Sequence, residues 1–185
     1  MLMVEKKAVF AAGCFWGVQY LFNKKQGVIS TIVGYTGGKI KEPSYEQVKT
    51  GITGHYEAIL VHYDEEQLSY EDLVKYFFEI HDFTQEDGQG PDIGPQYRSN
   101  IFYLDNEQKD IAQKIIMQLF ALGYDVKTGL TKFEKFWQAE DYHQNYYIRT
   151  GKKPYCHIHR PINWNNKDNG TLPKFYPQDY GPTII

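Results

Sequence analysis

Cysteine is scarce in this sequence: the 185 residues contain two, Cys14 and Cys156. Two cysteines do not make the framework of a disulfide-stapled secreted protein. The fold must rely instead on a hydrophobic core, and a chain of this length can bury a sizeable one. We therefore expect residues 1–185 to form a single domain.

The sequence also lacks a large excess of either charge and has no long apolar run. The chain has 20 basic and 23 acidic residues, a net charge of −3, so neither nucleic acid nor an anionic membrane surface is an expected partner. The first residues lack the apolar stretch of a signal peptide, and no run approaches the length that spans a membrane. We expect a soluble, cytoplasmic protein, and a monomer.

Aromatic side chains are abundant, with 16 tyrosines and 11 phenylalanines. Aromatic residues in loops often line recognition surfaces, whereas those in periodic segments pack in a core. Composition alone leaves both roles open.

The first half of the sequence predicts alternating strands and helices. Apolar, β-branched and alternating patterns predict strands at 8–12, 28–35 and 56–63. Helical spacing and capping residues predict helices within 15–26, 44–51 and 69–78.

The second half is less regular. Residues 82–98 have no period and are rich in glycine and proline, which is typical of a functional or disordered loop. We expect a strand at 101–104, a helix at 105–123, a strand at 129–136, a short polar helix at 139–150 and an irregular tail from about 162 to 185. These elements predict an α/β (α+β) two-layer sandwich with a mixed β-sheet and flanking helices.

Cys14 is the first candidate for a reactive group, within Gly13-Cys14-Phe15-Trp16-Gly17. It would rest on the first turn of a helix, where free N–H groups and the helix dipole stabilise a thiolate. An isolated cysteine is more often inert packing, but glycines on both sides would let a ligand approach closely. Phe15 and Trp16 would give that ligand a flat apolar wall.

Glu57 is an acid at the start of an apolar strand, on the same side as Ile59 and Val61. One interpretation is an exposed strand end. The other is a carboxyl group partly buried beside aromatic rings, whose pKa rises so that it can donate a proton near neutral pH.

Oxygen-binding groups are predicted around the irregular loop. Asp92 and Tyr97 lie within it, and Tyr45 follows the Gly37-Gly38 turn. Hydroxyls with an oriented carboxylate suit an oxygen that gains charge in a transition state. The alternative is a loop pinned by its own hydrogen bonds, which we favour for Arg98.

Cys156 begins the run Cys156-His157-Ile158-His159, which suggests zinc. The pattern is weak, because no second Cys or His pair accompanies it. We prefer a resolving thiol that reaches a second, oxidised sulfur. A spectator cysteine is the alternative.

Five motifs resemble those of the A-type peptide methionine sulfoxide reductases, over about residues 8–164. They are Gly13-Cys14-Phe15-Trp16-Gly17, Gly34-Tyr35-Thr36-Gly37-Gly38, Gly54-His55-Tyr56-Glu57, Gln96-Tyr97-Arg98-Ser99 and Ala139-Glu140-Asp141-Tyr142-His143-Gln144. The resemblance implies a two-layer fold with a ferredoxin-like core. It also implies reduction of the S epimer of methionine sulfoxide, free or in proteins, and so the repair of oxidised proteins.

The resemblance also implies a role for each matched residue. Cys14 would attack the sulfoxide sulfur, and Glu57 would protonate its oxygen. The substrate-binding positions are Phe15 and Trp16 for the methyl group, Tyr45 and Tyr97 for the oxygen, and Asp92 for orientation of the site. Cys156 would displace the sulfenic acid left on Cys14, and thioredoxin would reduce the resulting disulfide. No metal or organic cofactor is required.

Alternatives remain open at this point. Many family members carry a further cysteine that this sequence lacks, so an external thiol could replace Cys156 in the cycle. A cysteine hydrolase or acyltransferase would need one of the six histidines beside Cys14. A non-enzymatic binding module would use the aromatic loops alone.

Overall fold

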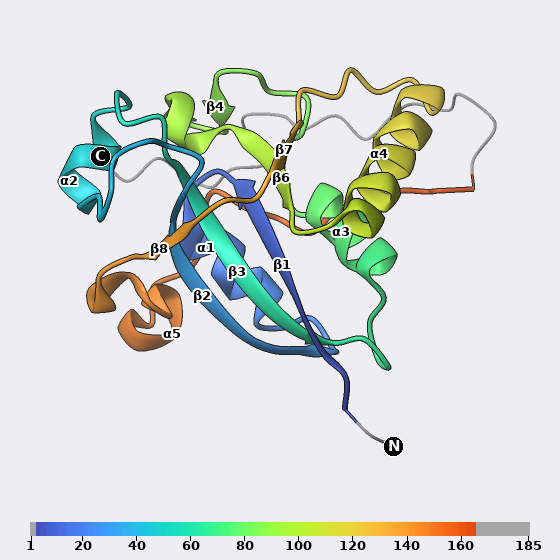
Figure 1. Cartoon of the computed structure of the whole chain (residues 1–185), viewed down its shortest axis with the longest axis horizontal. Helices are drawn as coiled ribbons and strands as arrows, with labels where there is room; N and C mark the ends of the chain where they lie inside the picture. Colours follow the sequence, from blue (N-terminus) through green and yellow to red (C-terminus); the bar gives the residue numbers. More distant parts are fainter. Residues whose placement is uncertain (1–2, 166–185) are drawn as a thin grey trace.

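A six-stranded mixed sheet forms the centre of the computed structural model, which describes residues 3–165 (Figure 1). The strands lie in the order β7-β6-β1-β3-β2-β8. Neighbours are antiparallel except β6 and β7, which are parallel. The strands are β1 (Glu5–Ala12), β2 (Val28–Thr36), β3 (Tyr56–Asp64), β6 (Ser99–Tyr103), β7 (Gly129–Lys132) and β8 (Phe136–Gln138).

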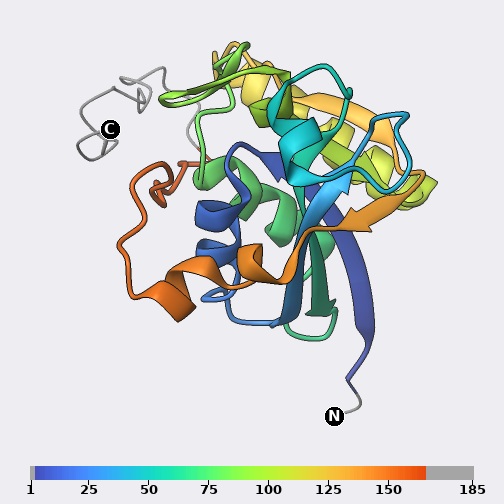
Figure 2. The ribbon, with the colours of Figure 1, turned by 90° about the vertical axis from the view of Figure 1, so that its left-hand side faces the viewer.

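The main helices cover one face of the sheet, as Figure 2 shows for α1 and α3. They are α1 (Phe15–Phe22), α3 (Tyr70–Glu79) and α4 (Asn106–Ala121), with the shorter α2 (Tyr45–Lys49) and α5 (Tyr146–Thr150) elsewhere. The chain order β1-α1-β2-β3-α3-β6, with strands in the order β6-β1-β3-β2, is the ferredoxin-like arrangement. The predicted two-layer fold is confirmed. Within residues 3–165, no helix is long and apolar enough to cross a membrane.

The core follows from the two-residue period of the strands. Phe10 faces the helices and stacks on Phe22 and Phe77, with ring centroids 5.6 and 5.0 Å away. The opposite face of the sheet is covered by Phe133 and Phe136. Both faces of β1 are therefore buried over residues 8–12, which explains the unbroken apolar run there.

Strand register brings four chain segments to one end of the sheet. Tyr35 near the end of β2 pairs with Glu57 at the start of β3. Ala12 at the end of β1 pairs with Ser99 at the start of β6. Because these strands are antiparallel, the residues that follow β1 and β2 lie beside those that precede β3 and β6. The candidate site occupies this end.

The predicted strand at 129–136 is wrong, because it is two strands on opposite edges of the sheet. β7 pairs with β6, and β8 pairs with β2. The chain between them crosses the sheet (Figure 1), and Phe133 and Phe136 bury their rings on the way. Burial of these two rings against the sheet outweighs the local preference for one continuous strand.

The predicted helix at 139–150 is broken into two pieces. They are a 3₁₀ turn, η2 (Asp141–His143), and α5. Between them the Gln144 side chain accepts from Val33 N (3.0 Å) and donates to Val33 O (2.9 Å) and Ala139 O (3.0 Å). Asn145 then adopts a left-handed φ of 52°, which ends the first turn. Hydrogen bonds to the β2 edge decide this geometry.

The predicted loop at 82–98 contains regular structure. It folds into a small hairpin, β4 (Gly88–Gln89) and β5 (Asp92–Ile93), followed by the 3₁₀ turn η1 (Pro95–Tyr97). Gln89 closes the hairpin base through two hydrogen bonds with the Asp82 backbone, both 2.9 Å. The irregular tail was predicted from about 162 to 185, and its part from 166 onward lies outside the described residues.

We expect Gln144→Ala to lower the free energy of unfolding by about 2–3 kcal/mol, because it leaves the backbone groups of Val33 without their partners. Urea denaturation at neutral pH measures the change. Gln113→Ala, at an exposed position of α4, is the matched control and should stay within about 0.5 kcal/mol. Equal small effects at both positions would contradict this account of the 139–150 segment.

Candidate active site

Cys14 occupies the N-cap position of α1, as predicted, but the helix does not bind its sulfur. The Cys14 side chain makes no capping hydrogen bond. The Phe15 N–H, one of the free donors of the first turn, donates to Glu57 Oε2 at 3.0 Å. The helix N-terminus therefore holds the carboxyl group rather than the thiol.

Glu57 is buried, with 3% of its surface exposed, so the exposed-strand-end interpretation is wrong. Burial raises its pKa to about 8, and the nearby Asp92 adds to this effect. The bond from Phe15 N–H opposes the rise because it stabilises the charged form. Glu57 is thus largely protonated at neutral pH.

Cys14, Asp92 and Cys156 come together from three distant parts of the chain. Their sulfur and oxygen atoms all lie within 4.8 Å of one another. Among the Cys, His, Asp and Glu side chains of residues 3–165, these three form the one cluster that is compact enough to hold a metal ion. A disulfide needs its sulfurs about 2.05 Å apart, so the two thiols, which are neighbours here, would have to approach each other to form one. Burial raises the pKa of Asp92 to about 6.

The two glycines beside Cys14 make room for protein segments. A Cβ on Gly13 would overlap Gln89 of the hairpin, and a Cβ on Gly17 would overlap His157 and lie 3.1 Å from Cys156 Sγ. Our prediction that they admit a ligand directly is therefore corrected. They let the hairpin and the Cys156 segment pack closely beside Cys14.

The negative charge of the two thiols is favoured on Cys156. The pKa of Cys156 is lowered, despite burial, mainly by a hydrogen bond from the Cys14 thiol. The next residue, His157, lowers it further, with its Nδ1 3.0 Å from Cys156 Sγ. The same hydrogen bond between the two thiols raises the pKa of Cys14, as do burial and the nearby carboxyls of Glu57 and Asp92. The neighbours of Cys14 therefore work against the thiolate that we expected from its place at the start of α1.

Aromatic rings surround His143 next to the thiols. His143 lies 4.5 Å from Tyr45 and 5.1 Å from Phe15, measured between ring centroids. Trp16 donates from Nε1 to His143 Nδ1 at 3.0 Å and stacks on Tyr146 at 3.7 Å. Phe15 and Trp16 thus both pack on His143, and we call these rings the aromatic wall. That a substrate packs against this wall stays a prediction.

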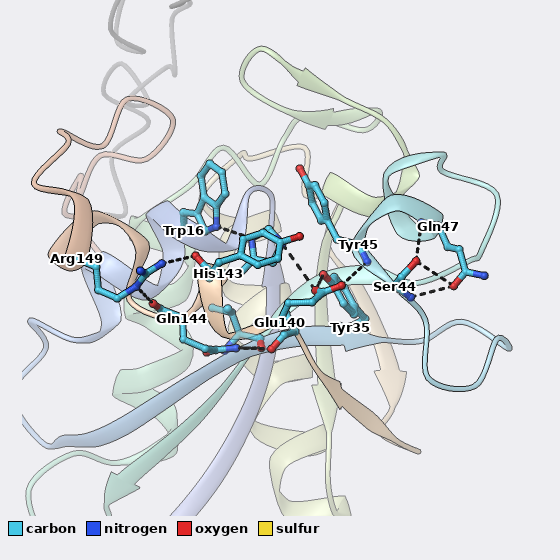
Figure 3. A network of polar contacts seen from close by, with 12 residues as sticks. Trp16, Tyr35, Ser44, Tyr45, Gln47, Glu140, His143, Gln144 and Arg149 are labelled. Carbon is cyan, nitrogen blue, oxygen red and sulfur yellow. Dashed lines mark hydrogen bonds and ion pairs between the residues drawn. The ribbon is translucent and has the colours of Figure 1, made fainter.

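Glu140 ties this aromatic wall to the sheet (Figure 3). Its carboxylate accepts from the Tyr35 hydroxyl and from Tyr45 N, both at 2.8 Å. Its Oε2 also lies 3.8 Å from His143 Nε2. Because His143 Nδ1 accepts from Trp16, Nε2 is the nitrogen that carries the proton. Glu140 thus connects Tyr35 of the sheet, the start of α2 at Tyr45, and His143.

Sequence reasoning gave no role to Glu140, His143 or Tyr35. The one feature of the sequence that pointed to them was that they lie within the motifs at 34–38 and 139–144. His157 was considered only as a zinc ligand. Glu140, His143 and Tyr35 each act through a partner far away in the chain, and the His157 ring is held by the distant Ala12 carbonyl, which residue type and spacing do not reveal.

Tyr45 and Tyr97 keep their hydroxyl protons at neutral pH. Burial and the neighbouring Glu57 raise the pKa of Tyr45 to about 12 and also raise that of Tyr97. Both are therefore hydrogen-bond donors. Arg98 is exposed, and the structural role that we favoured for it stays a prediction.

The histidine arrangement does not favour the hydrolase alternative. The ring that contacts a thiol is that of His157, and its partner is Cys156. His143 is engaged with Trp16 instead. A cysteine hydrolase needs the base on its nucleophile, whereas here it lies on the second thiol.

Comparison with known proteins gives one consistent result. The family model "Peptide methionine sulfoxide reductase" matches residues 6–173. A peptide methionine sulfoxide reductase MsrA of Nautilia profundicola is 50% identical over 150 residues, covering 81% of this chain and 87% of the relative. One of Thermus thermophilus is 45% identical over 157 residues, covering 84% and 89%. The reduced form of Saccharomyces cerevisiae Mxr1 superposes with a TM-score of 0.78 at 30% identity, covering 84% and 92%.

We expect Glu140→Gln to destabilise the fold by about 1–2 kcal/mol at pH 7, since the amide cannot accept both hydrogen bonds and the partly exposed site is screened by solvent. Burial opposes ionisation of Glu140, but the donors around it outweigh burial and lower its pKa. Its contribution is therefore present above the pKa of the unfolded chain and disappears as the pH falls through the folded pKa.

Urea denaturation at pH 7 and below about pH 4 measures this effect. The difference between wild type and Glu140→Gln should be largest at pH 7 and shrink in acid. Glu46→Gln, an exposed position of α2, serves as the control. A difference that does not depend on pH would show that the carboxylate charge is not what holds the wall.

Proposed function

The chain belongs to the peptide methionine sulfoxide reductase family, and from this premise we propose that it reduces the S epimer of methionine sulfoxide, free or within proteins, to methionine. One observation of the site carries the proposal. A thiol, Cys14, shares the end of the sheet with a buried carboxylic acid, Glu57, that stays protonated near neutral pH. Such a pair supplies both the nucleophile and the proton that a sulfoxide needs.

The first step transfers oxygen to Cys14. Glu57 gives its proton to the sulfoxide oxygen as the Cys14 sulfur attacks the sulfoxide sulfur. The oxygen then passes from the substrate sulfur to the Cys14 sulfur: a Cys14 S–O bond forms while the substrate S–O bond and the S–S bond made by the attack both break. Methionine leaves, and Cys14 is a sulfenic acid. The proton that Cys14 loses replaces the one that Glu57 gave. The net change is oxidation of one thiol and reduction of one sulfoxide.

Substrate binding in this proposal uses the surrounding side chains. The methyl group packs against Phe15 and Trp16, which the Glu140 network holds in place. The protonated hydroxyls of Tyr45 and Tyr97 donate to the sulfoxide oxygen. Asp92, whose Oδ2 is buried without a partner among the described residues, orients the polar side of the site.

The second step restores Cys14. Cys156 attacks the sulfenic acid, a Cys14–Cys156 disulfide forms, and water leaves. A dithiol protein of the thioredoxin type then reduces the disulfide, so thiols carry all the electrons and no metal or organic cofactor takes part. A solved structure of yeast Mxr1 is of its complex with Trx2. The cycle requires a reducing compartment, which supports the cytoplasm, and we assign it to residues 1–185 as one catalytic domain.

Methionine formation from its S-sulfoxide, with dithiothreitol or thioredoxin as reductant, tests the function directly. Wild type should turn over, and Cys14→Ser should show no activity because it lacks the nucleophile. One equivalent of sulfoxide without reductant should leave an intramolecular Cys14–Cys156 disulfide, seen by mass spectrometry. Ester cleavage without sulfoxide turnover would instead favour the hydrolase alternative.

We expect Glu57→Gln to lower sulfoxide reduction by about 10²–10⁴-fold, the usual contribution of a general acid. Wild-type activity should fall as the pH rises above about 8, where Glu57 loses its proton, and the residual activity of Glu57→Gln should lack this limb. Alkylation of Cys14 should change little. Equal losses of alkylation and reduction would contradict the role of Glu57 as proton donor.

A further inference from the structure

Cys156 and His157 form a buried pair that the first reaction step does not use. Cys156 Sγ lies 3.0 Å from His157 Nδ1, and His157 Nε2 lies 2.5 Å from the Ala12 carbonyl oxygen. The sulfur is completely buried, and 4% of the histidine is exposed. Bulk water therefore has little access to exchange protons with this thiol.

The Ala12 carbonyl fixes the tautomer of His157. A carbonyl oxygen can only accept, so Nε2 must carry a hydrogen. In the neutral ring Nδ1 then has a free lone pair, and it faces the Cys156 sulfur. The ring can take the thiol proton without turning, which is the arrangement of an oriented base in a nucleophile–base–orienter triad.

The fold leaves room for this pair at a specific place. Gly17 on α1 has no Cβ, and one there would overlap the His157 ring. The Cys156 segment passes on the outer side of α1 (Figure 2). His157 thereby lies against the end of β1, next to the segment that carries Cys14.

We propose that His157 is the catalytic acid–base group of the disulfide-forming step, an inference that rests on the proposed function. His157 takes the proton of the Cys156 thiol, and the thiolate attacks the sulfur of the Cys14 sulfenic acid. The S–S bond forms as the S–O bond breaks. The imidazolium proton goes to the departing hydroxide, which leaves as water, and His157 returns to its neutral form.

The charges around the pair support this direction of proton transfer. Cys156 and Asp92 raise the pKa of His157 against the effect of burial, so the ring accepts a proton readily once the thiol is adjacent. The titratable groups that face the pair from other elements or along its own segment are Cys14, Glu57, His81, Asp92, Tyr147 and Tyr155.

Single-turnover kinetics of His157→Gln separate the two steps. Rapid quenching with one equivalent of methionine S-sulfoxide measures methionine release, and thiol counting measures disulfide formation. We expect release within about threefold of wild type and disulfide formation slower by about 10²-fold, with a sulfenic acid that a dimedone probe traps. In the variant, disulfide formation should rise about tenfold per pH unit towards the thiol pKa.

His159→Gln is the matched control, because His159 lies two residues further on in the same segment and is exposed. It should form the disulfide at the wild-type rate. Disulfide formation by His157→Gln within about threefold of wild type would overturn the proposal. So would a parallel loss of both steps, which indicates a structural role.

A measurement that does not depend on the fold of the His157 variant completes the test. The Cys14→Ser protein lacks the thiol–thiol hydrogen bond that contributes most to lowering the pKa of Cys156, but ultraviolet absorbance should still show the Cys156 thiolate forming below the ordinary cysteine pKa, owing to His157. A thiol that titrates at its ordinary value would overturn the proposal. If wild type releases no methionine at all, the proposed function itself fails, irrespective of His157.

Discussion

The hydrogen bond from Phe15 N to Glu57 is the contact on which the site depends. It joins the start of α1 to the start of β3 at the end of the sheet where strand register gathers the reactive groups. It occupies a donor that would otherwise favour a Cys14 thiolate, and it holds a buried acid in reach of the thiol. Without it, Glu57 would be a carboxyl buried without a donor, which is costly.

The immediate neighbours of each thiol favour a negative charge on one sulfur over the other. The hydrogen bond to Cys156, burial and the nearby carboxyls of Glu57 and Asp92 all raise the pKa of Cys14. Cys156 has the His157 ring beside it, and its pKa is lowered, so it is the favoured anion. The reduced site thus keeps acid groups near the first sulfur and a base near the second, as a two-step reaction requires.

The aromatic wall shows how a polar network can shape an apolar surface. Flat rings pack in many orientations, but the hydrogen bond from Trp16 Nε1 to His143 selects one for the indole ring, and the bond from the Tyr45 backbone N–H to Glu140 holds the start of α2. These bonds join α1 and α2 to a segment that follows β8, whose own path is fixed by the hydrogen bonds of Gln144 to the β2 edge. The orientation of Trp16 on α1 is therefore set by a residue 127 positions away.

The sequence by itself determined the strands and helices with strong periods, the mixed two-layer fold, and the importance of Cys14, Glu57 and Cys156, because local patterns encode burial and residue type encodes chemistry. Tertiary structure decided the division of 129–136 between two sheet edges, the break at Asn145, the roles open to Glu140, His143 and His157, and which sulfur carries the charge. These depend on contacts between segments far apart in the chain, where burial and neighbouring charges outweigh local preference and set each pKa.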